Sequence, residues 1–179
     1  MISRKELSVP EFFNNYLGKA GDDHLLKALA GNTKRLKKCL KSISAKKSGH
    51  AYAEGKWTIK ELIQHMIDTE RVFIFRALWF SRKDPNPQFG FDENHWAQNA
   101  PVTHKSWEDL CAEFLALRKA TELFFQGLTN EQLQSVGIAS NNPISVAALG
   151  FIAAGHCNHH IDIIEERYFP KKKSKKTKK

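Results

Sequence analysis

The chain has 179 residues, 41% of them hydrophobic, so it is long and apolar enough for one packed domain and unlike a disordered protein. Its formal net charge is +9, but seven of its 28 basic residues lie in residues 171–179 (KKKSKKTKK). The other 21 basic residues face 19 acidic ones, a net charge of about +2, and a body this close to neutral argues against specific nucleic-acid binding.

The N-terminal part of the sequence predicts helices and no signal peptide. Its first residues, MISRKELSVPEFF, lack an apolar segment, and no later run reaches the length of a membrane span. A short helix is expected at residues 10–19, followed by a long helix at residues 22–43. The apolar face of the long helix contains Leu25, Leu29, Leu36, Cys39 and Ile43. Residues 44–56 are expected to form a connection.

The second long helix is expected to start after Trp57, where Thr58 and Glu61 have the spacing of a capping box. Its apolar stripe runs from Ile59 to Phe80. A long connection over residues 83–104 follows, with a short helix expected at 93–99. Connections of this length are often functional.

Two more long helices complete the predicted fold. The third covers residues 106–127 and is followed by a short turn at Thr129 and Gln132. The fourth covers residues 143–168 and ends before a proline. Strand patterns are absent. We therefore predict an all-α, up-down four-helix bundle with its long connection between the second and third helices.

The last nine residues and the three cysteines indicate a tail outside the bundle and a cytoplasmic location. Residues 171–179 contain no apolar side chain, so we expect a disordered Lys-rich tail after a domain of residues 1–170. The tail is interpreted as solubilising, with weak attraction to phosphates or acidic lipids as the alternative. Cys39, Cys111 and Cys157 form no CxxC pair, which favours reduced thiols in a cytoplasmic protein.

Two histidines interrupt the apolar stripe of the fourth helix. At 100° per residue, His156 and His160 fall within about 20° of the centre of the stripe, whereas His159 lies on its flank. Because the first two are one turn apart on the same side, both rings can reach one metal ion. The alternative is two buried histidines with other hydrogen-bond partners.

An open, catalytic type of metal site needs a third protein ligand. His65 is the best placed, in the middle of the second helix and about 120° from the centre of its apolar stripe. That position is the edge of the core, and taken alone it would indicate a surface histidine. The remaining histidines, near helix ends or in loops, are expected to be solvated.

Two charged residues also fall on stripe centres, Glu70 on the second helix and Arg118 on the third. We favour a structural interpretation, in which they form a partly buried ion pair with each other. In the functional alternative, Glu70 is a general base or a hydrogen-bond acceptor beside the metal, and Arg118 anchors an anionic substrate. Asn32 interrupts the apolar stripe of the first long helix and is a candidate to line a substrate cavity at the predicted metal site.

The sequence resembles the DinB/YfiT-like superfamily of metal-binding helical bundles over about residues 20–168. The motifs that carry the resemblance are GKWTIKELIQHMIDTE (residues 55–70), FDENHWA (91–97) and AAGHCNHHIDII (153–164). The resemblance implies that His65, His156 and His160 bind a divalent metal, zinc or nickel. Similar sequences often have Asp-Ser-His after the second-helix ligand, where this chain has Asp68, Thr69 and Glu70.

A metal with an open coordination position supports two reactions here. Metal-dependent hydrolysis is the activity usually attached to YfiT-like proteins, and transfer of a low-molecular-weight thiol to an electrophile is implied by the transferase members. We rank the hydrolase first. A non-catalytic metal-binding module is the third reading. We expect a small-molecule substrate and no membrane span, and leave open a homodimer.

Overall fold

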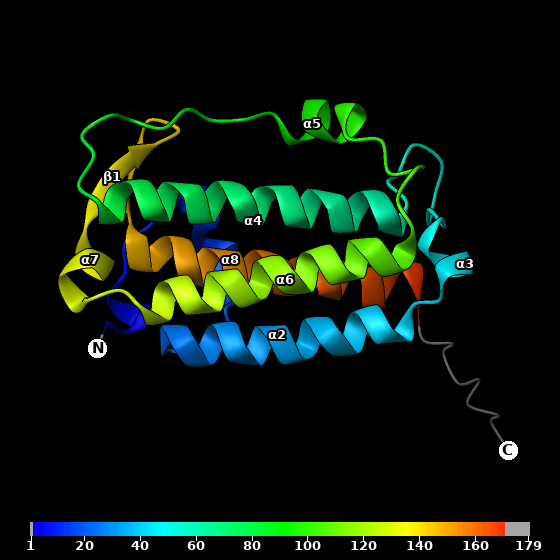
Figure 1. Ribbon diagram of the computed structural model, residues 1–179, viewed down its shortest axis with the longest axis horizontal. Coiled ribbons are helices and arrows are strands. Elements are labelled where there is room, and N and C mark those ends of the chain that lie inside the picture. The colour runs from blue at the N-terminus through cyan, green and yellow to red at the C-terminus, as the bar shows by residue number, and fades with distance from the viewer. Residues whose placement is uncertain (1, 171–179) are drawn as a thin grey trace, which may run out of the picture.

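The computed structural model describes residues 2–170, which form a bundle of four long helices (Figure 1). The predicted tail, residues 171–179, lies outside the described residues. The four helices are α2 (Leu25–Ser42), α4 (Ile59–Ser81), α6 (Trp107–Gln126) and α8 (Val146–Ile163). They confirm the predicted four-helix bundle. None of the described helices is long and apolar enough to cross a membrane.

Shorter elements join and extend the four helices. They are η1 (Arg4–Glu6), η2 (Glu11–Phe13), α1 (Asn14–Gly18), α3 (Ala45–Ser48), α5 (Glu93–Asn99), α7 (Asn130–Gln134) and the π-helical turn η3 (Ile164–Tyr168). The helix predicted at residues 10–19 is thus present as η2 and α1, and the helix predicted at residues 93–99 is α5.

The start of α4 is fixed by the predicted capping box. The Thr58 side chain accepts a hydrogen bond from the Glu61 backbone, and Glu61 Oε2 accepts one from the Thr58 backbone N–H at 2.6 Å. The same reciprocal pair, Thr129 and Gln132, begins α7. These caps satisfy backbone N–H groups that the first turn of a helix leaves unpaired.

A β-hairpin precedes α8, and the expectation that the chain contains no strands was wrong. Strands β1 (Val136–Ala139) and β2 (Asn142–Ser145) pair antiparallel. The turn between them places Ser140 and Asn141 at positive φ, the backbone of a tight two-residue hairpin. Consequently α8 begins at Val146, three residues later than predicted, after the side chain of Ser145 caps it.

The long connection between α4 and α6 is confirmed, and it sets the direction of α6. Residues 82–106 run back along α4, carrying α5, so that α6 runs parallel to α4 (Figure 1). Side-chain contacts agree, since Lys60 reaches the Lys105 carbonyl at 2.6 Å and Arg71 pairs with Glu113 at 2.8 Å. Direction therefore alternates from α2 to α4 and from α6 to α8 but not from α4 to α6, so the bundle departs at this step from the up-down order that was predicted.

Helix α8 is the centre of the bundle. It packs against α1, α2 and α4, and its residues from Val146 to Asn158 are all buried. Such a helix is apolar on every side except where function or pairing requires a polar group. Each polar residue of α8 therefore needs a specific explanation.

Candidate metal centre

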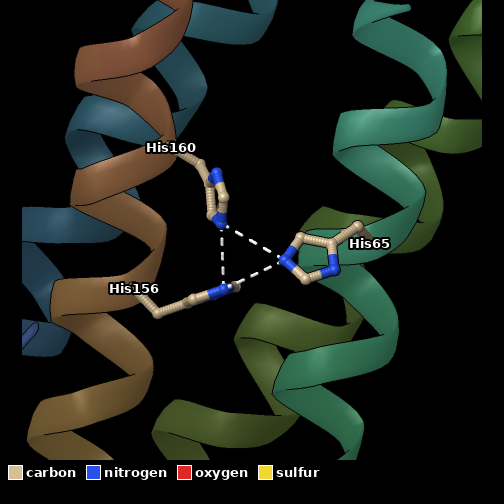
Figure 2. Close-up of side chains that lie close together, drawn as sticks. All are labelled: His65, His156 and His160. Atoms are coloured by element: carbon tan, nitrogen blue, oxygen red, sulfur yellow. Dashed lines mark hydrogen bonds between the residues drawn. The ribbon is translucent and has the colours of Figure 1, made fainter. Parts of the chain in front are cut away.

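Three histidines from two helices meet in the space between α4 and α8. His65 comes from α4, and His156 and His160 come from adjacent turns of α8 (Figure 2). The Nε2 atom of His65 lies 3.2 Å from Nε2 of His156 and 3.2 Å from Nε2 of His160. The Nε2 atoms of His156 and His160 are 3.0 Å apart. The structure thus brings together the three residues that the sequence pattern and the resemblance had selected.

The spacing of these nitrogens fits a shared metal ion. Zinc–imidazole bonds of about 2.0–2.1 Å at tetrahedral angles place two ligand nitrogens about 3.3 Å apart. The observed triangle of 3.0–3.2 Å is close to that value. Hydrogen bonds alone cannot satisfy three nitrogens that point at one another, because two of them must then face each other as two lone pairs or as two N–H groups. The cluster is the one group of metal-competent side chains found among the described residues.

Burial keeps the three imidazoles neutral. It lowers the pKa of His65 to about 4, against the opposing negative charge of Glu93. It lowers the pKa of His160 to about 2, with further contributions from His65 and His159. For His156, burial and then the neighbouring His160 and His65 bring the pKa well below its ordinary value. Neutral imidazole is the form that binds a metal, so the site is set to accept a cation at neutral pH.

The outer nitrogens of the ligand rings have little hydrogen bonding, and aromatic packing orients the rings instead. His65 Nδ1 lies 3.5 Å from Thr69 Oγ1, and His160 Nδ1 is buried without a partner among residues 2–170. Tyr16 meets the ring of His156 edge-on at 5.2 Å, and Trp57 lies 5.0 Å from the ring of His65. These aromatic contacts orient the rings. Metal-binding proteins commonly use hydrogen bonds to carboxylates or carbonyls for this purpose.

A cavity of about 350 Å³ opens beside the histidines. Six of its fourteen lining residues are Phe, Tyr or Trp, and the other eight are polar and come from four segments of the chain. The lining residues are Phe12, Phe13, Tyr16, Trp57, His65, Thr69, Phe73, Arg76, Phe91, Glu93, Asn94, Ser140, His156 and His160. The size is that of a pocket for a small molecule.

The other predicted site residues lie elsewhere. Glu70 Oε2 is 2.6 Å from Arg118 Nη2, and Thr121 donates to Glu70 Oε1 at 2.7 Å. Burial raises the pKa of Glu70, and the charge of Arg118 opposes that shift. Asn32 donates to Asn158 Oδ1 at 2.9 Å. None of Glu70, Arg118 and Asn32 lines the cavity at the histidines, and the geometry agrees with the favoured ion pair between α4 and α6.

Among the cavity residues that the sequence interpretation did not select are Tyr16, Trp57, Arg76 and Glu93. A signal existed for two of them. Arg76 follows His65 by eleven residues, which returns it to the same helix face within about 20°. Glu93 belongs to the FDENHWA motif, and the length of the surrounding connection marked it as a functional segment. No periodicity could place Tyr16 or Trp57.

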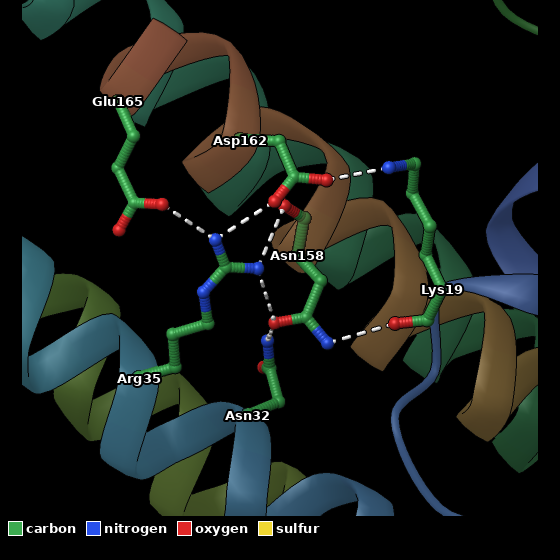
Figure 3. Close-up of polar contacts among 6 residues, drawn as sticks. All are labelled: Lys19, Asn32, Arg35, Asn158, Asp162 and Glu165. Atoms are coloured by element: carbon green, nitrogen blue, oxygen red, sulfur yellow. Dashed lines mark hydrogen bonds and ion pairs between the residues drawn. The ribbon is translucent and has the colours of Figure 1, made fainter. Parts of the chain in front are cut away.

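A polar network on the far side of α8 holds α1 in place (Figure 3). Asp162 pairs with Lys19 and, at 2.7 Å, with Arg35, which also reaches Glu165 at 2.8 Å. Asn158 Nδ2 donates to the Lys19 carbonyl at 2.9 Å. These contacts fix the C-terminal end of α1, the helix that carries the tyrosine packed against the triad.

The backbone of α1 touches α8 where α8 has a glycine. A Cβ at Gly155 would lie 1.7 Å from the Tyr16 carbonyl oxygen, so only glycine allows this approach. His156 is the next residue of α8. The close contact therefore places the ring of Tyr16 directly beside a predicted metal ligand.

Comparisons with known proteins agree with this geometry. The sequence model of the DinB superfamily matches residues 28–164. A protein of Oceanobacillus iheyensis named "Putative metal-dependent hydrolase" is 29% identical over 138 residues, which cover 76% of this chain and 79% of that protein. The structure of YfiT from Bacillus subtilis, described as "a probable metal-dependent hydrolase with an unusual four-helix bundle topology", superposes with a TM-score of 0.70. It is 16% identical and covers 90% of this chain and 88% of its own, which shows a shared fold.

Proposed function

The chain belongs to the DinB superfamily, and we propose that it is a metal-dependent hydrolase whose divalent ion is held by His65, His156 and His160. The observation that carries the proposal is the triangle of Nε2 atoms 3.0–3.2 Å apart, from two buried imidazoles and one partly buried imidazole, all neutral. Zinc and nickel both accept three imidazoles. The names of the two similar proteins support hydrolysis as the reaction.

A divalent ion held by three imidazoles, when bound, supplies Lewis-acid activation of a water and of a substrate carbonyl. The chain supplies the rest. Its aromatic walls, including Phe73 and Trp57, border the histidines, and His156 and His160 are almost fully buried. In such a low-dielectric site, charges and dipoles act more strongly than they do in water.

Two residues that line the cavity, Glu93 and Tyr16, carry groups that can exchange protons or hydrogen bonds with a substrate. Glu93 lines the cavity, and its charge reaches His65 and Tyr16. It can accept a proton from an attacking water, the role that the sequence had offered to Glu70. Burial, with a smaller contribution from Glu93, raises the pKa of Tyr16. The Tyr16 hydroxyl therefore stays protonated at neutral pH and can donate a hydrogen bond to the substrate.

The proposal is tested by metal-dependent turnover of a panel of small esters and amides. The full chain is assayed after loading with zinc or nickel, after chelation, and after reloading. Turnover should appear only in the loaded protein, fall at least about 100-fold in His160→Ala, and survive in His159→Ala. A protein that consumes an electrophile only when a small thiol is present would instead be a transferase. A protein that binds metal but turns over neither type of substrate would be a non-catalytic module.

A further inference from the structure

Arg76 is a buried cation on the same helix face as His65. It is 3% exposed and lines the cavity that contains the three histidines. A separation of eleven positions corresponds to three helical turns, or about 16 Å along α4. Long helical side chains tend to lean toward the N-terminus of their helix, which for Arg76 is the direction of His65.

The guanidinium has only neutral partners among residues 2–170. Nη2 donates to the Phe89 carbonyl at 2.6 Å and to Ser140 Oγ at 3.3 Å. No described hydrogen bond or ion pair uses Nε or Nη1, and no described carboxylate lies within ion-pair distance. Arg118, by contrast, has the Glu70 carboxylate at 2.6 Å. Burial without a counter-charge lowers the pKa of Arg76.

An uncompensated buried charge is costly, and proteins keep one where a ligand supplies its partner. The phenylalanine carbonyl and the serine hydroxyl hold the guanidinium in position without neutralising it. A guanidinium fixed in this way recognises planar oxyanions through paired N–H donors. Because a single cation matches a single negative charge, the matching group is a carboxylate rather than a phosphate dianion.

The other lining residues of the cavity indicate which part of such a ligand is apolar. Glu93 borders a small pocket together with His65 and Thr69 but without Arg76, so the acidic group lies at the histidine end, away from an anion at Arg76. Phe73 is two helical turns from His65 and one from Arg76 on α4, and Phe13 packs on it with ring centroids 6.0 Å apart. These two rings form an apolar stretch between the charged end and the histidines.

We infer that Arg76 binds the carboxylate of an elongated substrate, whose apolar body lies along Phe13 and Phe73 and whose reacting group reaches the histidines. The position of the reacting group rests on the proposed function. Binding of the carboxylate does not, because it requires Arg76 and the apolar walls but no metal.

The test compares 4-phenylbutyrate with its uncharged amide, 4-phenylbutanamide, by calorimetric titration of the full chain. Titrations use the protein as purified and after treatment with a chelator, so that any carboxylate–metal contact is separated from the contact with Arg76. We expect the carboxylate to bind about tenfold more tightly than the amide, with or without metal. Arg76→Met should remove this preference while keeping affinity for the amide. Arg76→Lys should keep part of it.

Arg71→Met is the matched control, since Arg71 lies five residues earlier on α4, is half-exposed and pairs with Asp68 and Glu113 outside the cavity. It should retain the full preference. Equal binding of acid and amide by the wild type, or no saturable binding of the acid, would overturn the inference. So would a preference that persists in Arg76→Met or vanishes on chelation. If Arg76→Met does not fold, the ratio of the wild-type affinities for the acid and the amide, together with the titration of Arg76→Lys, still tests the inference. A chain without turnover that prefers the acid would refute the hydrolase proposal alone.

Discussion

The two sides of α8 carry polar residues of opposite kinds. Toward α4, His156 and His160 point their nitrogens at one another and at His65, and the outer nitrogen of His160 has no described partner. Toward α1 and α2, Asn158 and Asp162 pair with side chains and backbone of the neighbouring helices. The two sets alternate by two residues along the helix, which at 100° per residue puts them on nearly opposite faces.

This difference separates structural polar groups from functional ones. Groups that pair with one another, such as Asp162 with Lys19 and Arg35 (Figure 3), stabilise the packing of helices. The histidine triad and Arg76 are of a second kind, because three ring nitrogens converge on one point and the guanidinium has no counter-charge; our proposals assign each of them a ligand from outside the chain. Three substitutions should separate the two kinds of group, and the first has the largest expected effect.

The Glu70–Arg118 pair should behave as a structural group. Replacing Glu70 by Gln leaves the fully buried Arg118 without its counter-charge, so the free energy of unfolding should fall by about 3–5 kcal/mol. Metal content per folded chain should not change. Urea denaturation beside elemental measurement checks both. The structural assignment would be contradicted if Glu70→Gln were as stable as the wild type and bound metal but had no activity. Glu70 would then have a functional role.

Gly155→Ala should disrupt the close contact between α8 and the backbone of α1. Its methyl group would collide with the backbone of Tyr16, so α1 must shift, and we expect a loss of about 1–3 kcal/mol. Gly31→Ala is the control, because a Cβ at this exposed position on α2 meets nothing within 4 Å. That change should be neutral or stabilise by up to about 1 kcal/mol. Thermal melts of the two variants should differ in sign, and equal losses would contradict the close approach of α1.

Asp162→Asn should have the smallest effect and a defined pH dependence. Burial opposes ionisation, but the ion pairs with Lys19 and Arg35 prevail and lower the pKa of Asp162 below its ordinary 3.8. The carboxylate therefore stabilises the fold above about pH 4, and this contribution is lost as pH falls through the lowered pKa. At pH 7 the variant should lose about 1 kcal/mol, given the partial exposure of the pair. The gap to the wild type, followed by melts from pH 7 to pH 2, should close in acid. A gap that widened in acid would contradict the assignment.

Much of the fold and the core of the site could be predicted because both depend on local pattern. Thr58 with Glu61 marked the start of α4, and the 100° rule placed His156 and His160 on the buried stripe. His65 was different. Its angle put it only at the core edge, and the family resemblance selected it. In the structure it is partly buried, at the edge of the triad that a metal would complete.

The features that sequence could not predict depend on long-range packing. The strands of the hairpin have four residues each, too short for a clear alternation, and Gly137 is required only because Phe80 packs over it. The parallel course of α6 depends on the path of residues 82–106, whereas the sequence gives only their number. The spacing from His65 gives the helix face of Arg76, but its neutral hydrogen-bond partners, Phe89 and Ser140, are distant in sequence and follow only from the fold.

The central claim is that His65, His156 and His160 form one site for a divalent ion, and a competition titration with a chromophoric chelator tests it most directly. Zinc and nickel are titrated in turn into the wild type, into each histidine-to-alanine variant of the triad, and into His159→Ala, whose ring lies 5.0 Å from that of His160 but outside the triangle. The wild type and His159→Ala should bind one ion per chain with the same affinity. Each triad variant should bind at least about 100-fold more weakly. Equal affinity in the wild type and in the triad variants would contradict the account.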